Sequence, residues 1–199
     1  MAATLTVYTL YHAPGSSSLA VHIALYEVGA PFEGKLIKFD RRDQDPPELR
    51  GLNPESKVPT LVIDGRPLTE VAAILYYLAR RYPEARLFPE GDIEAEAQVI
   101  SWMSFIASTL HPARARGAEQ AAKVWSWAEE KLGGRLWAAG AFSIADIHLF
   151  RLFWRLRGSV GADPALFPGL SAHHDRMMIR PAVQRTFAAE AAIGYGLPA

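Results

Sequence analysis

Three consecutive serines, Ser16, Ser17 and Ser18, follow a Pro-Gly pair near the N-terminus. Serine is a preferred residue at the start of a helix, because its hydroxyl satisfies backbone N–H groups that lack an intrahelical partner. One serine is enough for that task, so the run holds more hydroxyls than capping needs. A hydroxyl beside exposed N–H groups can also donate to a ligand thiolate, which lowers the pKa of the thiol. The serines therefore predict a site that stabilises a ligand thiolate electrostatically. The thiolate is the nucleophile, and the serine hydroxyl need not attack anything.

A second candidate is the Thr69-Glu70 pair ahead of an apolar helical pattern. Thr69 is expected to be the N-cap of a helix from Glu70 to Arg81, which Pro83 ends. Glu70 then lies in the first turn, where unpaired N–H groups and the helix macrodipole favour a ligand carboxylate. The acidic side chain can bind a ligand ammonium group at the same place. A ligand that carries both groups on one carbon, an α-amino acid end, fits this site.

Short strands are expected to hold both groups in position. Residues 60–63 are β-branched or aliphatic, and Asp64-Gly65 is a dipeptide that tight hairpin turns prefer. The expected strands are Thr4–Leu10, Pro31–Phe39 parallel to it, Thr60–Ile63 and a short one near Pro67 and Leu68. A helix is expected over Leu19–Val28, and no firm helix over 46–50.

The character of the chain changes after a segment rich in turn formers, residues 82–91, and is helical beyond it. Helices are expected over Ile93–Leu110, ended by His111-Pro112, over Glu119–Leu132, from Ser143 to Leu156, and within 167–187. Ser143 and Asp146 have the spacing of a capping box. We interpret these two residues as structural, because they cap an apolar helix.

Composition excludes several classes of function. Half of the 199 residues are hydrophobic and 21% are charged, which is typical of a globular protein. The 21 basic and 21 acidic residues cancel, so net charge suggests neither a nucleic acid nor an anionic membrane as partner. The absence of cysteine excludes disulfides, thiolate metal sites and a cysteine nucleophile. No metal site is expected, and the lack of a basic leader or a long apolar stretch favours a cytoplasmic protein.

Four ordered motifs resemble the cytosolic glutathione S-transferases: Pro-Gly-Ser-Ser-Ser, Val-Pro, Thr-Glu and Ser-Ile-Ala-Asp. The resemblance extends from about Thr6 to Phe187 and is greatest to the bacterial beta class. It implies an α/β thioredoxin-like N-terminal domain over 1–82, a linker over 83–91 and an all-α helical domain over 92–199. It also implies a homodimer with a glutathione site between the two domains.

The resemblance implies a set of glutathione-binding residues. In the family the Val-Pro proline is cis and the preceding backbone binds the cysteinyl part of glutathione, which places Val58 and Pro59 in that role. Glu70 and the N–H of Val71 would bind the γ-glutamyl end, where the family usually has a serine after the acidic residue. The remaining candidates are Asn53, which leads into the Val-Pro pair, Lys35 and Lys57 for the glycyl carboxylate, and Ser104 from a neighbouring subunit.

The residue that activates the thiol is not fixed by the resemblance. Aligned without gaps, the beta-class cysteine falls on Ser17, whereas the serine-type classes place the active hydroxyl on Ser16. The tyrosine-type classes use a phenol at the end of the first strand, where Tyr11 stands. We rank Ser17 first, then Ser16, then Tyr11, and expect no mixed disulfide with glutathione because a hydroxyl cannot form one. His12 and His111 are the candidates for the electrophile pocket.

The implied function is a glutathione transferase that activates the thiol of glutathione for attack on a small hydrophobic electrophile. Two alternatives share the same fold: a glutathione-dependent isomerase similar to the zeta class, and a non-catalytic protein that binds glutathione or hydrophobic ligands. The missing cysteine and Val71 in place of serine are the departures that keep these alternatives open.

Overall fold

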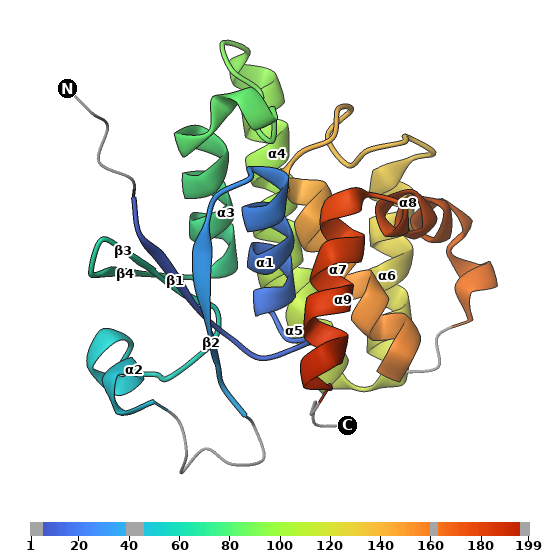
Figure 1. Ribbon diagram of the computed structural model, residues 1–199. Coiled ribbons are helices and arrows are strands. Elements are labelled where there is room, and N and C mark those ends of the chain that lie inside the picture. The colour runs from blue at the N-terminus through green and yellow to red at the C-terminus, as the bar shows by residue number, and fades with distance from the viewer. Residues whose placement is uncertain (1–5, 39–45, 160–162, 196–199) are drawn as a thin grey trace.

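The computed structural model describes residues 6–38, 46–159 and 163–195 (Figure 1). The outer ends of two expected strands, at Thr4 and at Phe39, lie outside these residues. The N-terminal part consists of β1 (Tyr8–His12), α1 (Ser18–Glu27), β2 (Phe32–Leu36), α2 (Pro47–Leu52), β3 (Thr60–Ile63), β4 (Arg66–Thr69) and α3 (Val71–Arg81).

The strands of the described residues form one four-stranded sheet in the order β2-β1-β3-β4. β1 pairs with β2 in parallel, whereas β3 is antiparallel to both β1 and β4. The turn at Asp64-Gly65 joins β3 to β4, and both residues have positive φ, 48° and 81°, as a tight hairpin of this kind requires. This mixed sheet, with α1 and α3 beside it, confirms the expected thioredoxin-like architecture.

The first strand is displaced toward the C-terminus from its expected position. It begins at Tyr8 and continues to His12, so Tyr11 and His12 belong to the strand and not to the loop that follows it. Successive side chains of a strand point to opposite faces of the sheet. Leu10 therefore packs with the helices α1 and α3, while Tyr11 packs on the other face with Ile37 and with Leu49 of α2.

The C-terminal part is helical, as expected. It contains η2 (Pro83–Ala85), α4 (Ile93–Phe105), η3 (Ile106–Leu110), α5 (His111–Ala113), η4 (Arg114–Arg116), α6 (Ala118–Leu132), α7 (Ile144–Ser159), η5 (Pro164–Leu166), α8 (Pro168–Met178) and α9 (Pro181–Ile193). None of the helices in the described ranges is long and apolar enough to cross a membrane.

Two expectations about helices are wrong. The pattern at 46–50 does form a helix, α2, because Pro47 stands at its start, where a missing N–H costs nothing, and Leu49 is buried under the sheet. The long helix does not end at His111-Pro112. It changes to π-helical geometry over 106–110 and continues through α5, because a proline is tolerated in the first turn of the new helical segment.

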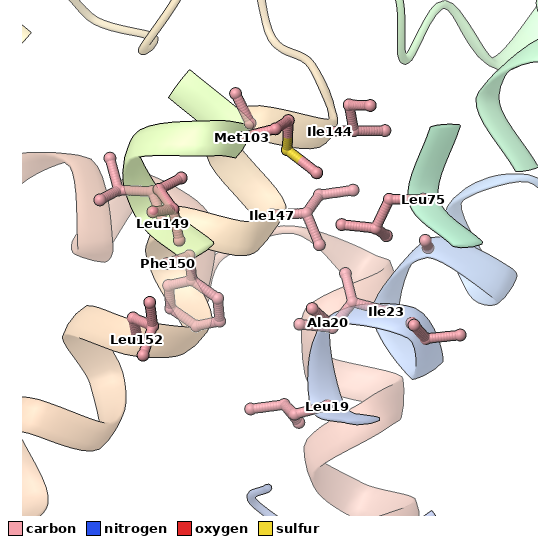
Figure 2. Packing of buried hydrophobic residues seen from close by; sticks show 14 of the residues in the cluster. Leu19, Ala20, Ile23, Leu75, Met103, Ile144, Ile147, Leu149, Phe150 and Leu152 are labelled. Atoms are coloured by element: carbon pink, nitrogen blue, oxygen red, sulfur yellow. The ribbon is translucent and has the colours of Figure 1, made fainter. Parts of the chain in front are cut away.

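The core lies between α1, α3 and α7 rather than within either half of the chain. α1 is apolar on nearly all sides, and residues 18–25 are all buried. Figure 2 shows Ala20 and Ile23 of α1 directed toward Leu75 of α3 and Ile147 of α7. A helix that is apolar all round must be covered by neighbours on every side. The helical part therefore packs directly on α1, whose N-terminus carries the serines.

The predicted cap of α7 is confirmed and is part of a larger network. Ser143 accepts the N–H of Ala145, while its own N–H and hydroxyl donate to Asp146 at 2.8 and 3.2 Å. The second carboxylate oxygen of Asp146 accepts the N–H of Ala138 at 2.7 Å and lies 3.0 Å from Nε2 of His173. Asp146 and His173 are both fully buried. The carboxylate thus joins the start of α7 to α8 and to the preceding loop.

Candidate active site

A cavity of about 470 Å³ lies where the N-terminal sheet meets the helical part. Its walls come from four places: the start of α1, the segment ahead of β3, the start of α3, and the helical segments η3, α5 and α7. The described residues that line it are Ser17, Asn53, Glu55, Lys57, Val58, Pro59, Thr69, Glu70, Val71, Ala72, Ala107, His111 and His148. The cavity brings together most of the residues that the sequence analysis singled out.

Of the three serines, the structure places Ser17 at the cavity. Ser16 and Ser18 bond to each other, Oγ to Oγ at 2.8 Å, and the hydroxyl of Ser18 also bonds both backbone groups of Ala13. These two side chains stabilise the turn before α1. Ser17 occupies the N-cap position, yet its hydroxyl makes no capping bond to the described backbone of α1. Capping therefore does not explain the Ser17 side chain.

A cation from the helical part contacts this serine. Arg151 of α7 donates from Nε to the carbonyl of Ser16 at 3.1 Å and from a terminal nitrogen to Oγ of Ser17. Arg151 is 4% exposed, so its charge lies in an environment that screens it weakly. The arginine fixes the serine loop against α7.

The start of α3 differs from the expected arrangement. Thr69 ends β4 instead of capping the helix, and Glu70 takes the N-cap position, one residue before the first turn. The φ of Glu70 is +66°, a region that costs a non-glycine residue about 1–3 kcal/mol and is enriched at functional sites. The first N–H groups of α3, from Val71 onward, have no partner within the helix, as at the start of any helix. This end of α3 lies at the cavity. The corrected geometry keeps Glu70 and the Val71 N–H together on the cavity wall.

The segment ahead of β3 forms a rigid wall. The Val58-Pro59 peptide bond is cis, as the resemblance implied. Asn53 lines the cavity, but its side chain is used within this segment: Nδ2 donates to the carbonyl of Lys57 at 3.1 Å and to Thr60, while Oδ1 accepts the N–H of Glu55. Asn53 therefore shapes the wall through these bonds.

The two candidate lysines lie in different places. Lys57 lines the cavity, where Nζ lies 2.7 Å from Glu55 and most of the side chain is exposed. Lys35, on β2, pairs with Glu48 of α2 at 2.7 Å. This pair lies against the ring of Tyr11, whose hydroxyl donates to the same Glu48 carboxylate. Lys35 thus belongs to the face of the sheet that α2 covers.

Tyr11 and His12 do not reach the cavity, which corrects both assignments. Tyr11 is 2% exposed beneath α2, and burial raises the pKa of its phenol. His12 points to the opposite face, where its ring lies 5.4 Å from that of His22 on α1. Both errors have one cause: the strand extends through these residues, so the alternation of a strand turns their side chains onto the two packed faces.

The helical wall of the cavity contains Ala107, His111 and His148. Burial, with Arg151 and His111 adding to it, holds the pKa of His148 well below its usual range, so this imidazole is neutral near neutral pH. Ser104 is exposed on α4, one turn before this wall, and its carbonyl accepts from Ser108. A role for Ser104 toward a neighbouring subunit stays a prediction.

A second polar cluster lies behind the serine loop. His12, His22 and Glu190 each place one potential ligand atom within 4.8 Å of the others, and all three are buried. Two imidazoles and a carboxylate are donors that Zn²⁺ accepts. Here His22 and Glu190 already bond each other at 2.9 Å, and the other Glu190 oxygen accepts the N–H of Gly15 at 2.6 Å. The cluster ties α9 to the loop that carries Ser17.

This cluster predicts a loss of stability in acid. Burial, with His22 adding to it and Glu190 opposing it, lowers the pKa of His12 from 6.5 to about 4. The folded state thus favours neutral His12, so its contribution is complete above pH 6.5 and is lost as the pH falls toward about 4. We expect His12→Gln to remove up to about 3 kcal/mol of the acid-induced decrease in unfolding free energy. Urea unfolding of both proteins across this pH range measures it, and parallel pH profiles would contradict it.

The fold and the cavity define a class: a thioredoxin-like sheet with a cis Val-Pro wall, joined to a helical part that closes the site. Comparison with known proteins identifies the family. Residues 6–80 match the glutathione S-transferase N-terminal domain and residues 95–181 match the C-terminal domain. The chain belongs to the glutathione S-transferase family.

Similar proteins cover nearly the whole chain. A glutathione S-transferase of Xanthomonas campestris is 32% identical over 202 residues, and one of Escherichia coli O157:H7 is 31% identical over 199. Each alignment covers 91% of this chain and 98% of the relative. The solved structure of a sphingomonad glutathione S-transferase complexed with glutathione superposes with a TM-score of 0.83 at 35% identity, covering 92% of this chain and 98% of that one.

Sequence reasoning missed two polar residues at the site, His148 and Arg151. Both lie within the helix expected from Ser143 to Leu156, of which only the cap residues Ser143 and Asp146 were given a role. They are three residues apart, so they share a face of α7, and they are polar within the otherwise apolar run Ile-His-Leu-Phe-Arg-Leu. That spacing is the signal that could have indicated them.

Proposed function

We propose that this protein is a glutathione transferase whose cavity holds glutathione and whose Ser17 hydroxyl activates the thiol. One observation carries the proposal: a single cavity joins Ser17, the cis Val58-Pro59 wall and Glu70 to the helical residues Ala107, His111 and His148. The family membership and the similarity to transferases over the whole chain favour this activity over the isomerase and the non-catalytic alternatives.

The two ends of glutathione match two parts of the cavity wall: the start of α3 and the segment ahead of β3. Its γ-glutamyl end is an α-amino acid, with an ammonium group for Glu70 and a carboxylate for the Val71 N–H at the start of α3. The backbone of Val58 can pair with the cysteinyl part, and Lys57, which lines the cavity, can pair with the glycyl carboxylate. This orientation directs the thiol toward the start of α1.

Activation needs only that the thiolate be more stable in the site than in water. Ser17 donates a hydrogen bond to the sulfur, which favours the thiolate, so the thiol loses its proton to solvent at lower pH. The thiolate then forms an S–C bond with an electrophilic carbon, and the leaving group departs with the electrons of its bond. The helical wall holds that electrophile, which we propose to be small and largely apolar.

We propose a division into a glutathione-binding domain over 1–82, a linker over 83–91 and a helical domain over 92–199, supported by the positions of the two family matches. We also propose a homodimer, in which Ser104 of one subunit approaches the partner's site, and a cytoplasmic location.

Titration calorimetry with glutathione, combined with thiolate absorbance as a function of pH, tests the function. We expect saturable binding and a bound thiol whose pKa is lower than that of free glutathione. Formation of a thioether from an aryl or alkyl halide should follow the same pH dependence. Lack of glutathione binding would exclude the transferase.

Val71 predicts weaker binding of glutathione than a serine would give at this position. Val71→Ser adds a hydroxyl where the family usually carries one, and a net hydrogen bond contributes about 0.5–1.5 kcal/mol. We expect the dissociation constant for glutathione to fall by about two- to tenfold, measured by calorimetry. Val71→Ala is the matched control, because it removes the same methyl groups without adding a hydroxyl. Equal affinities of the serine and alanine variants would contradict the prediction.

A further inference from the structure

Arg151 is a buried cation that the helical part contributes to the serine loop. Its Nε donates to the Ser16 carbonyl at 3.1 Å, and a second guanidinium nitrogen donates to Oγ of Ser17. Only 4% of the residue is exposed, and it lies on α7, 134 positions from the serine. Two bonds from one planar group restrict both the loop and the side chain.

The direction of the bond to Ser17 determines what the hydroxyl can do. A guanidinium carries five N–H donors and no acceptor, so in this contact Ser17 must accept. Its own proton is then left to donate elsewhere, and Ser17 lines the cavity. A hydroxyl without such a partner rotates freely between donating and accepting. The arginine therefore leaves the Ser17 hydroxyl as a hydrogen-bond donor toward the cavity, which is the role that a thiolate acceptor requires.

Titratable groups of both signs surround the serine loop and the cavity. His148 lines the cavity, and burial holds its pKa well below the usual range, so it is neutral and the positive charge beside Ser17 comes from Arg151. The other titratable groups that line the cavity are His111 on the helical side and Glu55, Lys57 and Glu70 on the opposite wall. On the far side of the loop, Glu190 accepts the Gly15 N–H at 2.6 Å and is paired with His22.

We propose that Arg151 is a positioning residue for the transferase reaction: it fixes the Ser17 hydroxyl as a donor toward the glutathione sulfur and places a positive charge behind it. The inference rests on the proposed function, because the sulfur it acts on is that of glutathione. It assigns to the helical part of the chain a share in activating the thiol, and not only the binding of the electrophile.

The test is the pKa of the thiol in bound glutathione, measured from thiolate absorbance at saturating glutathione. Arg151→Met keeps much of the side-chain volume and removes the charge and the donors. We expect the pKa of the bound thiol to rise by about one unit. Because Arg151 acts through Ser17, the double variant Ser17→Ala/Arg151→Met should have nearly the same thiol pKa as Ser17→Ala alone. An unchanged pKa in Arg151→Met, or effects that simply add, would overturn the proposal.

Two further variants separate this role from folding. Arg157→Met removes another arginine of α7, which bonds His174 and lies 3.7 Å from Asp175, so it should leave the thiol pKa unchanged. Arg151→Lys keeps the charge and loses the planar fork, and should raise the pKa less than Arg151→Met does. If Arg151→Met does not fold, a rise in Arg151→Lys supports the proposal and an unchanged value overturns it. A wild-type protein that binds glutathione without lowering its thiol pKa would instead count against the proposed function itself.

Discussion

Ser17→Ala is expected to raise the pKa of bound glutathione by about one to two units and to reduce kcat/KM by about ten- to a hundredfold. The reason is that Ser17 is the serine that lines the cavity, and a hydrogen bond to a charged group contributes about 1.5–3 kcal/mol. Glutathione affinity should change little, because the Val58 and Glu70 sides of the wall are untouched. Thiolate absorbance and steady-state kinetics with an aryl halide measure the two effects.

The neighbouring serine and a conservative variant serve as controls for this prediction. Ser17→Thr retains the hydroxyl and should preserve most of the lowered thiol pKa. Ser16→Ala breaks the 2.8 Å contact with Ser18, so its main effect should be on the stability of the turn. A thiol pKa that rises in Ser16→Ala and not in Ser17→Ala would move the activating hydroxyl to Ser16.

Asp146→Ala is expected to cause the largest loss of stability, about 3–5 kcal/mol of the unfolding free energy. The side chain is fully buried and accepts from the backbone of Ala138 and Ser143, as well as contacting His173. Removing the carboxylate leaves these buried polar groups without a partner, and each such group costs about 1–3 kcal/mol. Urea unfolding monitored by tryptophan fluorescence gives the difference.

The chain provides a matched control in Asp175. This aspartate also lies 3.0 Å from a histidine, His174, but its side chain is 74% exposed. Exposed pairs contribute about 0–1 kcal/mol, so Asp175→Ala should be nearly neutral. Equal destabilisation by the two substitutions would show that burial is not what makes Asp146 important.

Local sequence patterns determined those features that depend on neighbours in the chain. The Asp64-Gly65 hairpin, the cap formed by Ser143 and Asp146, and the helix that ends before Pro83 all follow from the backbone preferences of a few adjacent residues. The resemblance added the cis Val58-Pro59 bond, which no local pattern specifies. Glu70 was assigned to the correct wall although its helix starts one residue later than expected.

The assignments that failed depend on where a side chain points. Tyr11 and His12 follow the strand that was expected to end at Leu10, and the extension of β1 through them turned them onto the two packed faces of the sheet. Sequence patterns locate the end of a strand only to within about two residues. A shift of that size decides whether a side chain is turned onto a packed face of the sheet, and with it the function that the residue can have.

The sequence by itself determined the family, the order of the elements and a set of three candidates for the activating group. Only the tertiary structure showed that Ser17 lines the cavity, and only it brought His148 to that cavity and Arg151 to the Ser17 hydroxyl. The physical reason is separation along the chain: Arg151 meets Ser17 across 134 positions, through the packing of α7 on α1. Local preferences fix helices and turns, but contacts at such separations arise only when buried apolar faces determine how those helices pack.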